Sequence, residues 1–417
     1  MQVFKFGGAS VKNAEGVRNV AKLLQEVGYQ DTLVVVSAMG KTTNKLELVV
    51  EAYFEEKTKL QEIIQNIIAC HEEVLFELFP NKQHLIYKTV TDLFNELTGF
   101  LNWNKSPNYS FVYDQVVGYG ELISTAIIAT YLNEIGIKSN WLDIRSVIKT
   151  DNSYRDAKVN WELTKQNVTN HIKKSSLYIT QGFLGSDENN FTTTLGREGS
   201  DYTAAILAYC LNANNVTIWK DVPGVLNADP RHFNETQLLH QISYEEAIEL
   251  AFYGASVIHP KTLQPLQRKE IPLYVKSFLN PLDKGTCVSK GKQLEPFVPC
   301  FIVKKNQILI SLSSLDFSFI VEENISEIFA LLHQYKLKVD VIQNSAISFS
   351  VCVDDTYKNI EALLQILRSK FKVSCSENVS LYTIRHNNPE AFEKIVKGKE
   401  VLLKQEKDNT VQLITSN

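Results

Sequence analysis

The chain has 417 residues, of which 44% are apolar and 22% are charged, and its formal net charge is −4 at pH 7. A chain of this length buries a sizeable core, and its size predicts one large and one smaller domain, or three modules. Lysine and arginine are spread rather than clustered, which excludes an extended nucleic-acid interface. No apolar run approaches about 18 residues and no basic leader opens the chain, so neither a membrane span nor a secretory signal is expected.

The cysteines indicate a reducing compartment. Six of them are scattered along the chain without a Cys-x-x-Cys pair, a spacing that suits free thiols better than a disulfide framework or a zinc site. We therefore expect a cytoplasmic protein without a thiolate-bound metal. The positions are Cys70, Cys210, Cys287, Cys300, Cys352 and Cys375.

The chain opens on a short apolar strand, predicted over Val3–Phe6, that runs through Gly7 and Gly8 into a helical pattern. Glycine lets a backbone approach a ligand closely, and the first N–H groups of a helix lack internal partners and attract anions. Lys5 adds a full positive charge at the same point. The pattern is typical of an anion-binding turn, although a plain tight connection would have the same sequence.

Short β-branched runs then alternate with helical stretches, which predicts a three-layer α/β domain around a central, mostly parallel sheet. Residues 46–100 are helical throughout, as a long excursion from that sheet. Polar residues and two prolines interrupt the pattern near 290–299, so we assign residues 1–290 to this large domain. Its further strands are predicted at Thr32–Ser37, Trp141–Ile144, Leu177–Phe183, Val216–Val222 and Leu273–Phe278.

Beyond residue 300 the pattern changes to strand, helix, two strands, helix and a strand start at Lys372–Cys375. This order predicts a small ferredoxin-like α+β unit over residues 300–376. A second, shorter copy follows over residues 377–417, with a strand at Val379–Ile384, a helix at Pro389–Val396 and a closing hairpin. Because no final helix follows, we expect the second unit to be truncated.

Residues 192–204 form a loop rich in hydroxyl groups and glycines that runs into an apolar helix. Capping of that helix by Ser200 or Asp201 would explain one residue of the loop. It would not explain Arg197, two glycines and a run of hydroxyl groups together, in a chain that also carries Lys5. The combination favours an anion or phosphate site.

A third segment, Trp219–Arg231, follows a predicted buried strand at its carboxyl end, where open α/β sheets place ligands. Turn chemistry accounts for its prolines and its glycine. The charged residues Lys220, Asp221 and Arg231 on one such loop favour a polyphosphate and its metal ion.

One more cation, Lys261, follows His259 and Pro260 at the end of a helical pattern. A lone histidine beside a proline is typical of a structural residue at a turn rather than of a catalyst. We therefore expect a structural role for His259.

Taken in order, six segments resemble the aspartokinase branch of the amino-acid kinase family, and the resemblance covers nearly the whole chain. Their length and order are far more specific than a lone glycine loop. The C-terminal units are similar to the paired ACT modules of that family, which usually sense an end-product amino acid. The six segments are KFGGAS at Lys5–Ser10, VVVSAMGKTTN at Val34–Asn44, GYGELIS at Gly118–Ser124, TTTLGREGSDYTAA at Thr192–Ala205, WKDVPGVLNADPR at Trp219–Arg231 and YGASVIHPKT at Tyr253–Thr262.

The resemblance implies transfer of the γ-phosphoryl group of ATP to the β-carboxylate of L-aspartate, giving 4-phospho-L-aspartate, the entry to lysine, threonine, methionine and isoleucine synthesis. A carboxylate acceptor is ionised near neutral pH, so the reaction needs no general base. The difficult part of the reaction is to bring the acceptor carboxylate and the γ-phosphate, both anions, together in line. Cations and backbone N–H groups must therefore neutralise and position them. The resemblance places Mg²⁺ mainly on the ATP phosphates, without a direct protein ligand.

The resemblance also implies a role for each site residue. Lys5, Gly8 and Asp201 form the catalytic set, in which Asp201 orders Lys5 and the hydration shell of Mg²⁺. For the acceptor, Arg197 pairs with a carboxylate through two nitrogens, and Glu121 takes the ammonium group. Thr43 hydrogen-bonds a carboxylate oxygen, and Ser37 belongs to the same loop. The nucleotide is assigned to Lys5, Gly7, Gly8, Ser10, Lys220, Asp221, Arg231 and Lys261.

Several positions depart from the family pattern. Many relatives have glycine at Glu198, threonine at Lys220, tyrosine at Leu226 and lysine at Ser256, which leaves the nucleotide contacts open. In the C-terminal units, Phe319–Ile325 has two acids and no glycine where the family has a His-x-Gly-Phe-like turn, and Gln343–Ala346 stands where relatives often carry Thr-Ser-Glu. We therefore expect feedback inhibition by lysine to be weak or absent.

Two other functions stay open from the sequence. A sibling kinase acting on glutamate or acetylglutamate would share the phosphate machinery, but such kinases usually lack segments 118–124 and 219–231 together with ACT tails. A non-catalytic amino-acid sensor would fit Leu226, Ser256 and the altered ACT loop, whereas intact Lys5 and Arg197 argue against it.

The expected partners follow from the same resemblance. L-aspartate and ATP are the small-molecule partners, and neither a nucleic acid nor a membrane is expected. ACT units have exposed sheet edges that commonly pair, so we expect a homodimer through Gln307–Val353.

Overall fold

The computed structural model describes residues 1–255, 258–316 and 318–416, so Ser256, one of the departures from the family pattern, lies outside the described residues. Contacts divide the chain into two compact units. The first comprises Met1–Val225, Leu238–Ile248 and Val257–Pro296, and the second comprises Leu226–Gln237, Glu249–Ser256 and Phe297–Asn417. In the part of the chain that is described, no helix is both long and apolar enough to cross a membrane.

The first unit is built on an eight-stranded sheet with the order β10-β12-β11-β7-β1-β2-β4-β3. Every neighbouring pair is parallel except β11 with β12, so the predicted α/β class with a mostly parallel sheet is confirmed. The strands are β1 (Gln2–Phe6), β2 (Thr32–Val36), β3 (Asn140–Leu142), β4 (Leu177–Gln181), β7 (Val216–Lys220), β10 (Gln241–Ser243), β11 (Leu273–Ser277) and β12 (Thr286–Ser289).

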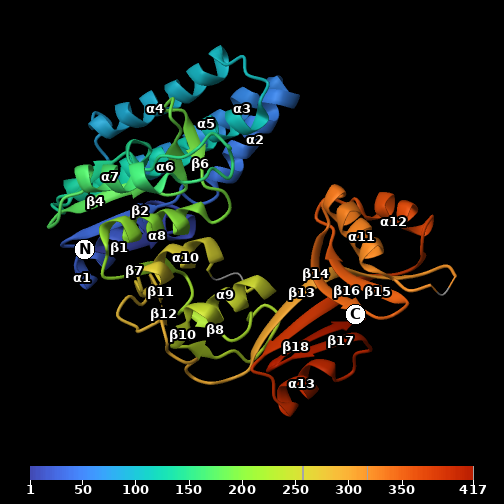
Figure 1. Cartoon of the computed structure of the whole chain (residues 1–417). Helices are drawn as coiled ribbons and strands as arrows, with labels where there is room; N and C mark the ends of the chain where they lie inside the picture. The colour runs from blue at the N-terminus through green and yellow to red at the C-terminus, as the bar shows by residue number, and fades with distance from the viewer. Residues whose placement is uncertain (256–257, 317, 417) are drawn as a thin grey trace. The chain divides into compact units, whose positions relative to one another are not determined.

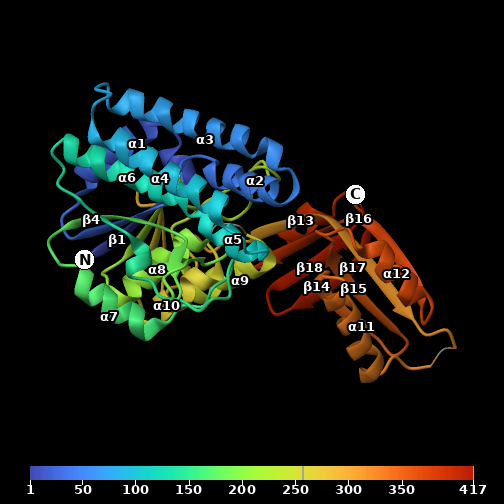
Figure 2. The same ribbon diagram turned by 90° about the horizontal axis from the view of Figure 1, so that it is seen from above.

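Helices cover both faces of this sheet, which makes the three layers that the alternation predicts (Figures 1 and 2). On one face, α1 and α6 bury apolar side chains against Phe4, Phe6, Val34 and Val36. On the other face α8 packs against β1, β2 and β7, and it also contacts α7 and α10. These helices are α1 (Ala14–Val27), α6 (Tyr119–Glu134), α7 (Trp161–His171), α8 (Gly199–Leu211) and α10 (Pro260–Arg268).

The predicted helical excursion is also confirmed. It consists of α2 (Thr42–Glu55), α3 (Lys57–Leu78) and α4 (Leu85–Trp103), followed by α5 (Tyr109–Val117). The side chains of His84 and Asn108 accept hydrogen bonds from the first turns of α4 and α5 and so define where these helices begin. Figure 1 shows α3 and α4 in the same part of the first unit. Their buried apolar side chains belong to the same core as those of α1 and α6.

One predicted strand ends early. The run Trp141–Ile144 leaves the sheet after Leu142, because Asp143 accepts a hydrogen bond from the backbone N–H of Arg145 at 3.0 Å and starts the 3-10 turn η2 (Ile144–Ser146). The remaining short elements before residue 297 are η1 (Gly8–Val11), β5 (Leu184–Ser186), β6 (Thr192–Thr194), β8 (Val225–Leu226), β9 (Leu238–Leu239) and α9 (Tyr244–Tyr253).

The second unit contains a six-stranded antiparallel sheet with the order β14-β15-β13-β16-β18-β17. The two strand starts predicted near residues 372 and 379 are wrong as separate strands, because β16 runs through both. The elements are β13 (Cys300–Ser313), α11 (Glu322–Gln334), β14 (Lys338–Asn344), β15 (Ser348–Asp354), α12 (Ile360–Arg368), β16 (Lys372–Arg385), α13 (Pro389–Val396), β17 (Val401–Lys407) and β18 (Thr410–Thr415).

Two of the apolar cores on this shared sheet include helices. One joins α11 and α12 to Ile310 and Phe349, and the other joins α13 to Ile384 and Leu413. The pairing of β13 with β16 shifts register between Lys304 and Gln307, where the two halves meet. The predicted small α+β units are therefore present as a fold, and they share their two longest strands (Figure 1).

Candidate active site

The strand β1 directs Lys5 to the face of the sheet where α8 lies. Successive side chains of a strand point to opposite faces, and Phe4 and Phe6 belong to the core beneath α1 and α6. Lys5 Nζ lies 2.6 Å from Oδ1 of Asp201, in the first turn of α8, and the two side chains are only 11% and 5% exposed. Low exposure makes this ion pair hard to break, because either charge alone would be left desolvated.

The turn after β1 packs directly against the turn after β2. The carbonyl of Gly8 accepts a hydrogen bond from the N–H of Gly40 at 3.0 Å. A Cβ on Gly8 would lie 2.6 Å from the carbonyl oxygen of Gly40 and 2.7 Å from that of Ala38. Ser10 follows in η1, where its side chain is buried and its N–H donates to the carbonyl of Gly7. Only glycine allows this approach at position 8.

Replacing Gly8 with alanine is therefore expected to lower kcat at least about a hundredfold, because the clash is with backbone and must separate the two turns that position the ligand. Steady-state kinetics and a thermal unfolding curve will measure the activity and the fold. Gly99→Ala is the control, since nothing lies within 4 Å of its added Cβ, and it should match the wild type in activity and unfold at the same or a slightly higher temperature, because Gly99 lies inside α4. Wild-type activity in Gly8→Ala would contradict this account of the turn.

The turn after β2 also contacts α6. Ser37 donates its N–H to the carbonyl of Phe6 at 3.0 Å, and its own carbonyl accepts from Oγ of Ser124 at 2.9 Å. A Cβ on Gly120 would lie 2.9 Å from Cβ of Ala38, so α6 approaches the turn closely. Thr43 is half-buried in the first turn of α2. These contacts place the start of α6 against the same edge of the sheet as Ser37.

Glu121, in the first turn of α6, is a buried acid, with 3% of its surface exposed. Its Oε2 has no hydrogen-bond partner among the described residues. Burial raises the pKa of Glu121 to about 8, against the opposing effects of the Ala38 N–H and of the Lys5 ammonium group. The side chain is thus largely neutral near pH 7, and a cationic ligand would ionise it.

Arg197 lies on the loop between β6 and α8, exposed and without an ion-pair or hydrogen-bond partner in the described part of the chain. The loop is tightly placed at its neighbour Gly196, which has φ 80° and whose Cβ would lie 2.6 Å from Oδ1 of Asp156. Neither Ser200 nor Asp201 caps α8: the N-cap residue is Glu198, and its side chain makes no capping hydrogen bond. Because no described side chain pairs with Arg197, its guanidinium group is available to bind an anion.

Asp114 supports the strand that leads to Arg197, and the sequence did not reveal this role. Its fully buried carboxylate accepts hydrogen bonds from N and Oγ1 of Thr194, both at 2.8 Å, and from the N–H of Arg155. Burial raises its pKa to about 6, although these hydrogen bonds favour the ionised form. Asp114 thereby holds β6 just before Arg197. A lone acid within the apolar helix Tyr109–Val117 was the available signal.

The other charged residues of the first unit that were predicted to bind the nucleotide are Lys220, Asp221 and Lys261. Lys220 ends β7, where its carbonyl accepts from the N–H of Phe278 at 2.9 Å, and Asp221 follows, exposed. Lys261 forms an ion pair with Asp156. His259 caps α10, because its Nδ1 accepts from the N–H of Lys261 at 3.2 Å, so its predicted structural role is confirmed.

Arg231 belongs to the second unit, where its guanidinium group pairs with Asp229 at 2.6 Å. This contact holds the pKa of Asp229 below its usual value. In the second unit, Arg231 is therefore a partner of a neighbouring acid.

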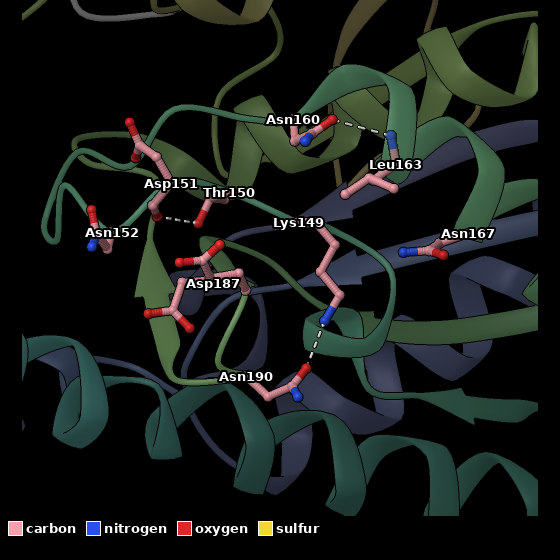
Figure 3. Close-up of a pocket in the computed structure, with 10 residues that line it drawn as sticks. Lys149, Thr150, Asp151, Asn152, Asn160, Leu163, Asn167, Asp187 and Asn190 are labelled. Atoms are coloured by element: carbon pink, nitrogen blue, oxygen red, sulfur yellow. Dashed lines mark hydrogen bonds between the residues drawn. The ribbon is translucent and has the colours of Figure 1, made fainter.

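The cavity drawn in Figure 3 contains none of the predicted site residues. It has a volume of about 600 Å³ and lies in the first unit. Lys149 points into it and donates a hydrogen bond to Oδ1 of Asn190 at 2.9 Å. Its other lining residues are mostly amides and carboxylates: Thr150, Asp151, Asn152, Asn160, Leu163, Asn167, Asp187 and Glu188.

Comparison with known proteins shows the family. Residues 1–277 match the model of the amino acid kinase family. The chain is 32% identical over 399 residues to lysine-sensitive aspartokinase 3 of Escherichia coli, covering 93% of this chain and 87% of that protein.

Two solved structures of E. coli aspartokinase III are similar over nearly the whole chain. The complex with lysine and aspartate has a TM-score of 0.84 at 28% identity and covers 99% of this chain and 95% of the other. The complex with aspartate and ADP has a TM-score of 0.81 at 27% identity and covers 100% and 96%. The chain therefore belongs to the amino acid kinase family and, within it, to the aspartokinases.

Proposed function

We propose that the chain is an aspartate kinase, which transfers the γ-phosphoryl group of ATP to the β-carboxylate of L-aspartate. The observation that carries the proposal is the buried ion pair between Lys5 and Asp201, next to the Gly7–Gly8 turn. The related E. coli enzyme with bound aspartate and ADP supports both ligands. The product is 4-phospho-L-aspartate.

In the proposed reaction, a β-carboxylate oxygen of aspartate forms a bond to the γ-phosphorus as the bond from that phosphorus to the bridging oxygen of ADP breaks. The acceptor is already ionised, so no proton has to be removed. Lys5 and the N–H groups of the turn at Gly8 stabilise the charge on the transferring group. Asp201 keeps the Lys5 ammonium group in place. Mg²⁺, bound with ATP, supplies further neutralisation of phosphate charge.

We assign the acceptor site to residues at the same edge of the sheet. Glu121 binds the ammonium group of aspartate. Its Oε2 is buried without a partner in the described residues, and a cation would supply that partner and offset the cost of burying the ionised carboxylate. The free guanidinium group of Arg197 binds a carboxylate through two hydrogen bonds. Thr43 and Ser37 supply hydrogen bonds to the acceptor.

For the nucleotide we retain Gly7, Gly8 and Ser10 around the phosphates. Lys261 is assigned to the same phosphates and must exchange its contact with Asp156 for them. Lys220 and Asp221 complete the proposed nucleotide set within the first unit. The nucleotide role of Arg231, which pairs with Asp229 in the second unit, stays a prediction from the sequence.

An acyl phosphate assay tests the proposed function. The product of each of three acceptors, L-aspartate, L-glutamate and N-acetyl-L-glutamate, is trapped with hydroxylamine for the wild type and for Arg197→Ala. We expect ATP-dependent hydroxamate with aspartate alone, and a KM for aspartate raised about a hundredfold in the variant. Signal with another acceptor would point to a sibling kinase, and no signal with any acceptor would favour a non-catalytic sensor.

We further propose residues 1–290 as the catalytic domain, and residues 300–376 and 377–417 as ACT units through which the enzyme forms a homodimer. The support is the two helix-containing cores on one sheet and the exposed edge strand β14. A cytoplasmic location is part of the proposal, supported by six cysteines that are all free.

Weak feedback inhibition is the expected regulatory property. In β14, the carboxylate of Asp340 already pairs with Nζ of Lys304 at 2.7 Å and lies 3.8 Å from Nζ of Lys338. Lys304 offsets much of the charge of this acid, and the segment Gln343–Ala346 adds no second acid, so β14 offers little net negative charge to the ammonium group of a free amino acid. We expect lysine or threonine at about millimolar concentration to leave the initial rate within about twofold. Clear inhibition by either amino acid would contradict this expectation.

A further inference from the structure

Glu198, immediately after Arg197, has a backbone conformation that glutamate rarely adopts. Its φ of 54° and ψ of 27° lie in the left-handed region, which favours glycine, asparagine or aspartate. Its backbone carbonyl accepts hydrogen bonds from the N–H groups of Asp201 at 3.1 Å and Tyr202 at 3.2 Å. The residue thus starts α8, and a glycine would start it with less strain.

The side chain of Glu198 does not compensate for this strain within the protein. Its Oε2 is buried and has no hydrogen-bond partner in the described ranges, and the side chain does not cap α8. The residue as a whole is half-buried, but its Oε2 is shielded from water and has room for a partner that a ligand can supply. The chemistry of a carboxylate requires that this ligand be a cation or a hydrogen-bond donor.

The position of Glu198 indicates which cation. The N-cap residue and the third residue of a helix lie on one side of its first turn, as the reciprocal contacts of a capping box show. Glu198 and Asp201 occupy these two positions, and Oδ1 of Asp201 is already paired with Lys5. With Arg197 assigned to the acceptor carboxylate, Glu198 and Asp201 share only the ammonium group of Lys5 among the described cations of this site. A divalent cation would allow a further carboxylate to lie close to the phosphates.

The donor set fits Mg²⁺ in particular. This ion is commonly held by one or two protein carboxylates together with substrate phosphates and water. The described residues contain no group of three or more His, Cys, Asp and Glu side chains able to hold a metal. A site at Glu198 would therefore be completed only by the nucleotide.

We propose that Glu198 is a direct ligand of the divalent cation that accompanies the nucleotide. This inference rests on the proposed function, because ATP supplies the other ligands. It assigns a role to a position where the sequence departs from its family. It also replaces the expectation that Mg²⁺ is held without a direct protein ligand. The ammonium group of aspartate is assigned to Glu121, so Glu198 is not needed for the acceptor.

The test measures metal binding rather than turnover. Free Mn²⁺ is followed by its electron paramagnetic resonance signal during titration of the enzyme with saturating ADP. Three variants are compared with the wild type: Glu198→Gln, which keeps the size, Glu198→Gly, which relieves the left-handed backbone, and Glu162→Gln, an exposed acid in the first turn of α7. Thermal unfolding of each variant reports whether it is folded.

We expect both Glu198 variants to bind Mn²⁺ with ADP about tenfold more weakly, or worse, and the Glu162 control to match the wild type. In EDTA, where no divalent cation is present, the affinity for ADP is compared instead. Glu198→Gln should bind ADP at least as tightly as the wild type, because a charge that repels the phosphates has been removed. Glu198→Gly should have an unchanged or higher unfolding midpoint.

Unchanged Mn²⁺ affinity in both Glu198 variants would overturn the inference. A raised KM for aspartate without any change in Mn²⁺ binding would also overturn it and assign Glu198 to the acceptor. If the wild type binds ADP in EDTA but retains no Mn²⁺, only this inference fails. If the wild type binds no ADP at all, the proposed function fails with it.

Discussion

Replacing Lys5 with methionine is expected to lower kcat by about 10²–10³, because a preorganised charge acting on the transferring phosphoryl group is worth that much in rate. The methionine keeps most of the length of the side chain and removes only the ammonium group. Steady-state rates at saturating ATP and aspartate will measure the effect.

The same change is expected to destabilise the protein, and this loss must be separated from the loss of rate. Asp201 would remain buried without its partner, which costs about 3–5 kcal/mol. Adding Asp201→Asn to Lys5→Met removes the uncompensated charge and should recover much of that stability without recovering kcat. If the double variant regained both, Lys5 would be a structural residue rather than a catalytic one.

The affinity for aspartate is expected to depend on pH through Glu121. Its pKa in the ligand-free enzyme is about 8, and an ammonium ligand favours the ionised form, so binding near pH 7 must release a proton. The affinity should therefore rise about tenfold per pH unit between about pH 6 and pH 8 and then level off. Isothermal titration in buffers of different ionisation enthalpy will measure the proton released.

Glu121→Gln is the matched control because glutamine has the same size and cannot ionise. Its affinity for aspartate should be nearly independent of pH, close to that of the wild type near pH 6 and about a hundredfold weaker near pH 8. An affinity of the wild type that does not change over this range would contradict the assignment of Glu121 to the ammonium group.

The same pKa affects stability with a definite sign. A folded-state value raised from 4.5 to about 8 means that the contribution of Glu121 to stability is fully present below pH 4.5 and is lost as the pH rises through 8. The ligand-free wild type should lose more stability than Glu121→Gln between about pH 5 and pH 8. Aspartate should restore the difference.

Local patterns predicted most of the fold. The strands β1 and β2 and the helices α3 and α4 follow directly from β-branched runs and from helical periodicity. The pattern was wrong at β16, because Ser376–Asn378 is polar and is typical of a turn. In the structure Asn378 takes a φ of 55° and the strand continues, since its partner β13 shifts register nearby and absorbs the irregularity. Whether β16 continues through these residues depends on its pairing with β13. The sequence of β16 alone does not show that pairing.

Local patterns were less informative about the site. Nothing near Lys5 indicates that Asp201 will lie 2.6 Å from it, because the parallel sheet and α8 bring the two together. Only the resemblance to a family linked them beforehand. The buried acid Asp114 was missed because its role depends on Thr194 and Arg155, which are distant in sequence. The unpartnered carboxylate of Glu198 became visible only in the structure, as burial without a hydrogen bond.

The central claim is that a β-carboxylate oxygen of aspartate becomes bonded to phosphorus, and an isotope experiment tests it most directly. The enzyme is incubated with ATP and L-aspartate carrying ¹⁸O in the β-carboxylate, the acyl phosphate is cleaved with hydroxylamine, and the released phosphate is analysed by ³¹P NMR. Hydroxylamine attacks the carbonyl carbon, so the account predicts one ¹⁸O atom in each phosphate released. Phosphate without ¹⁸O would show transfer to water and would contradict the account.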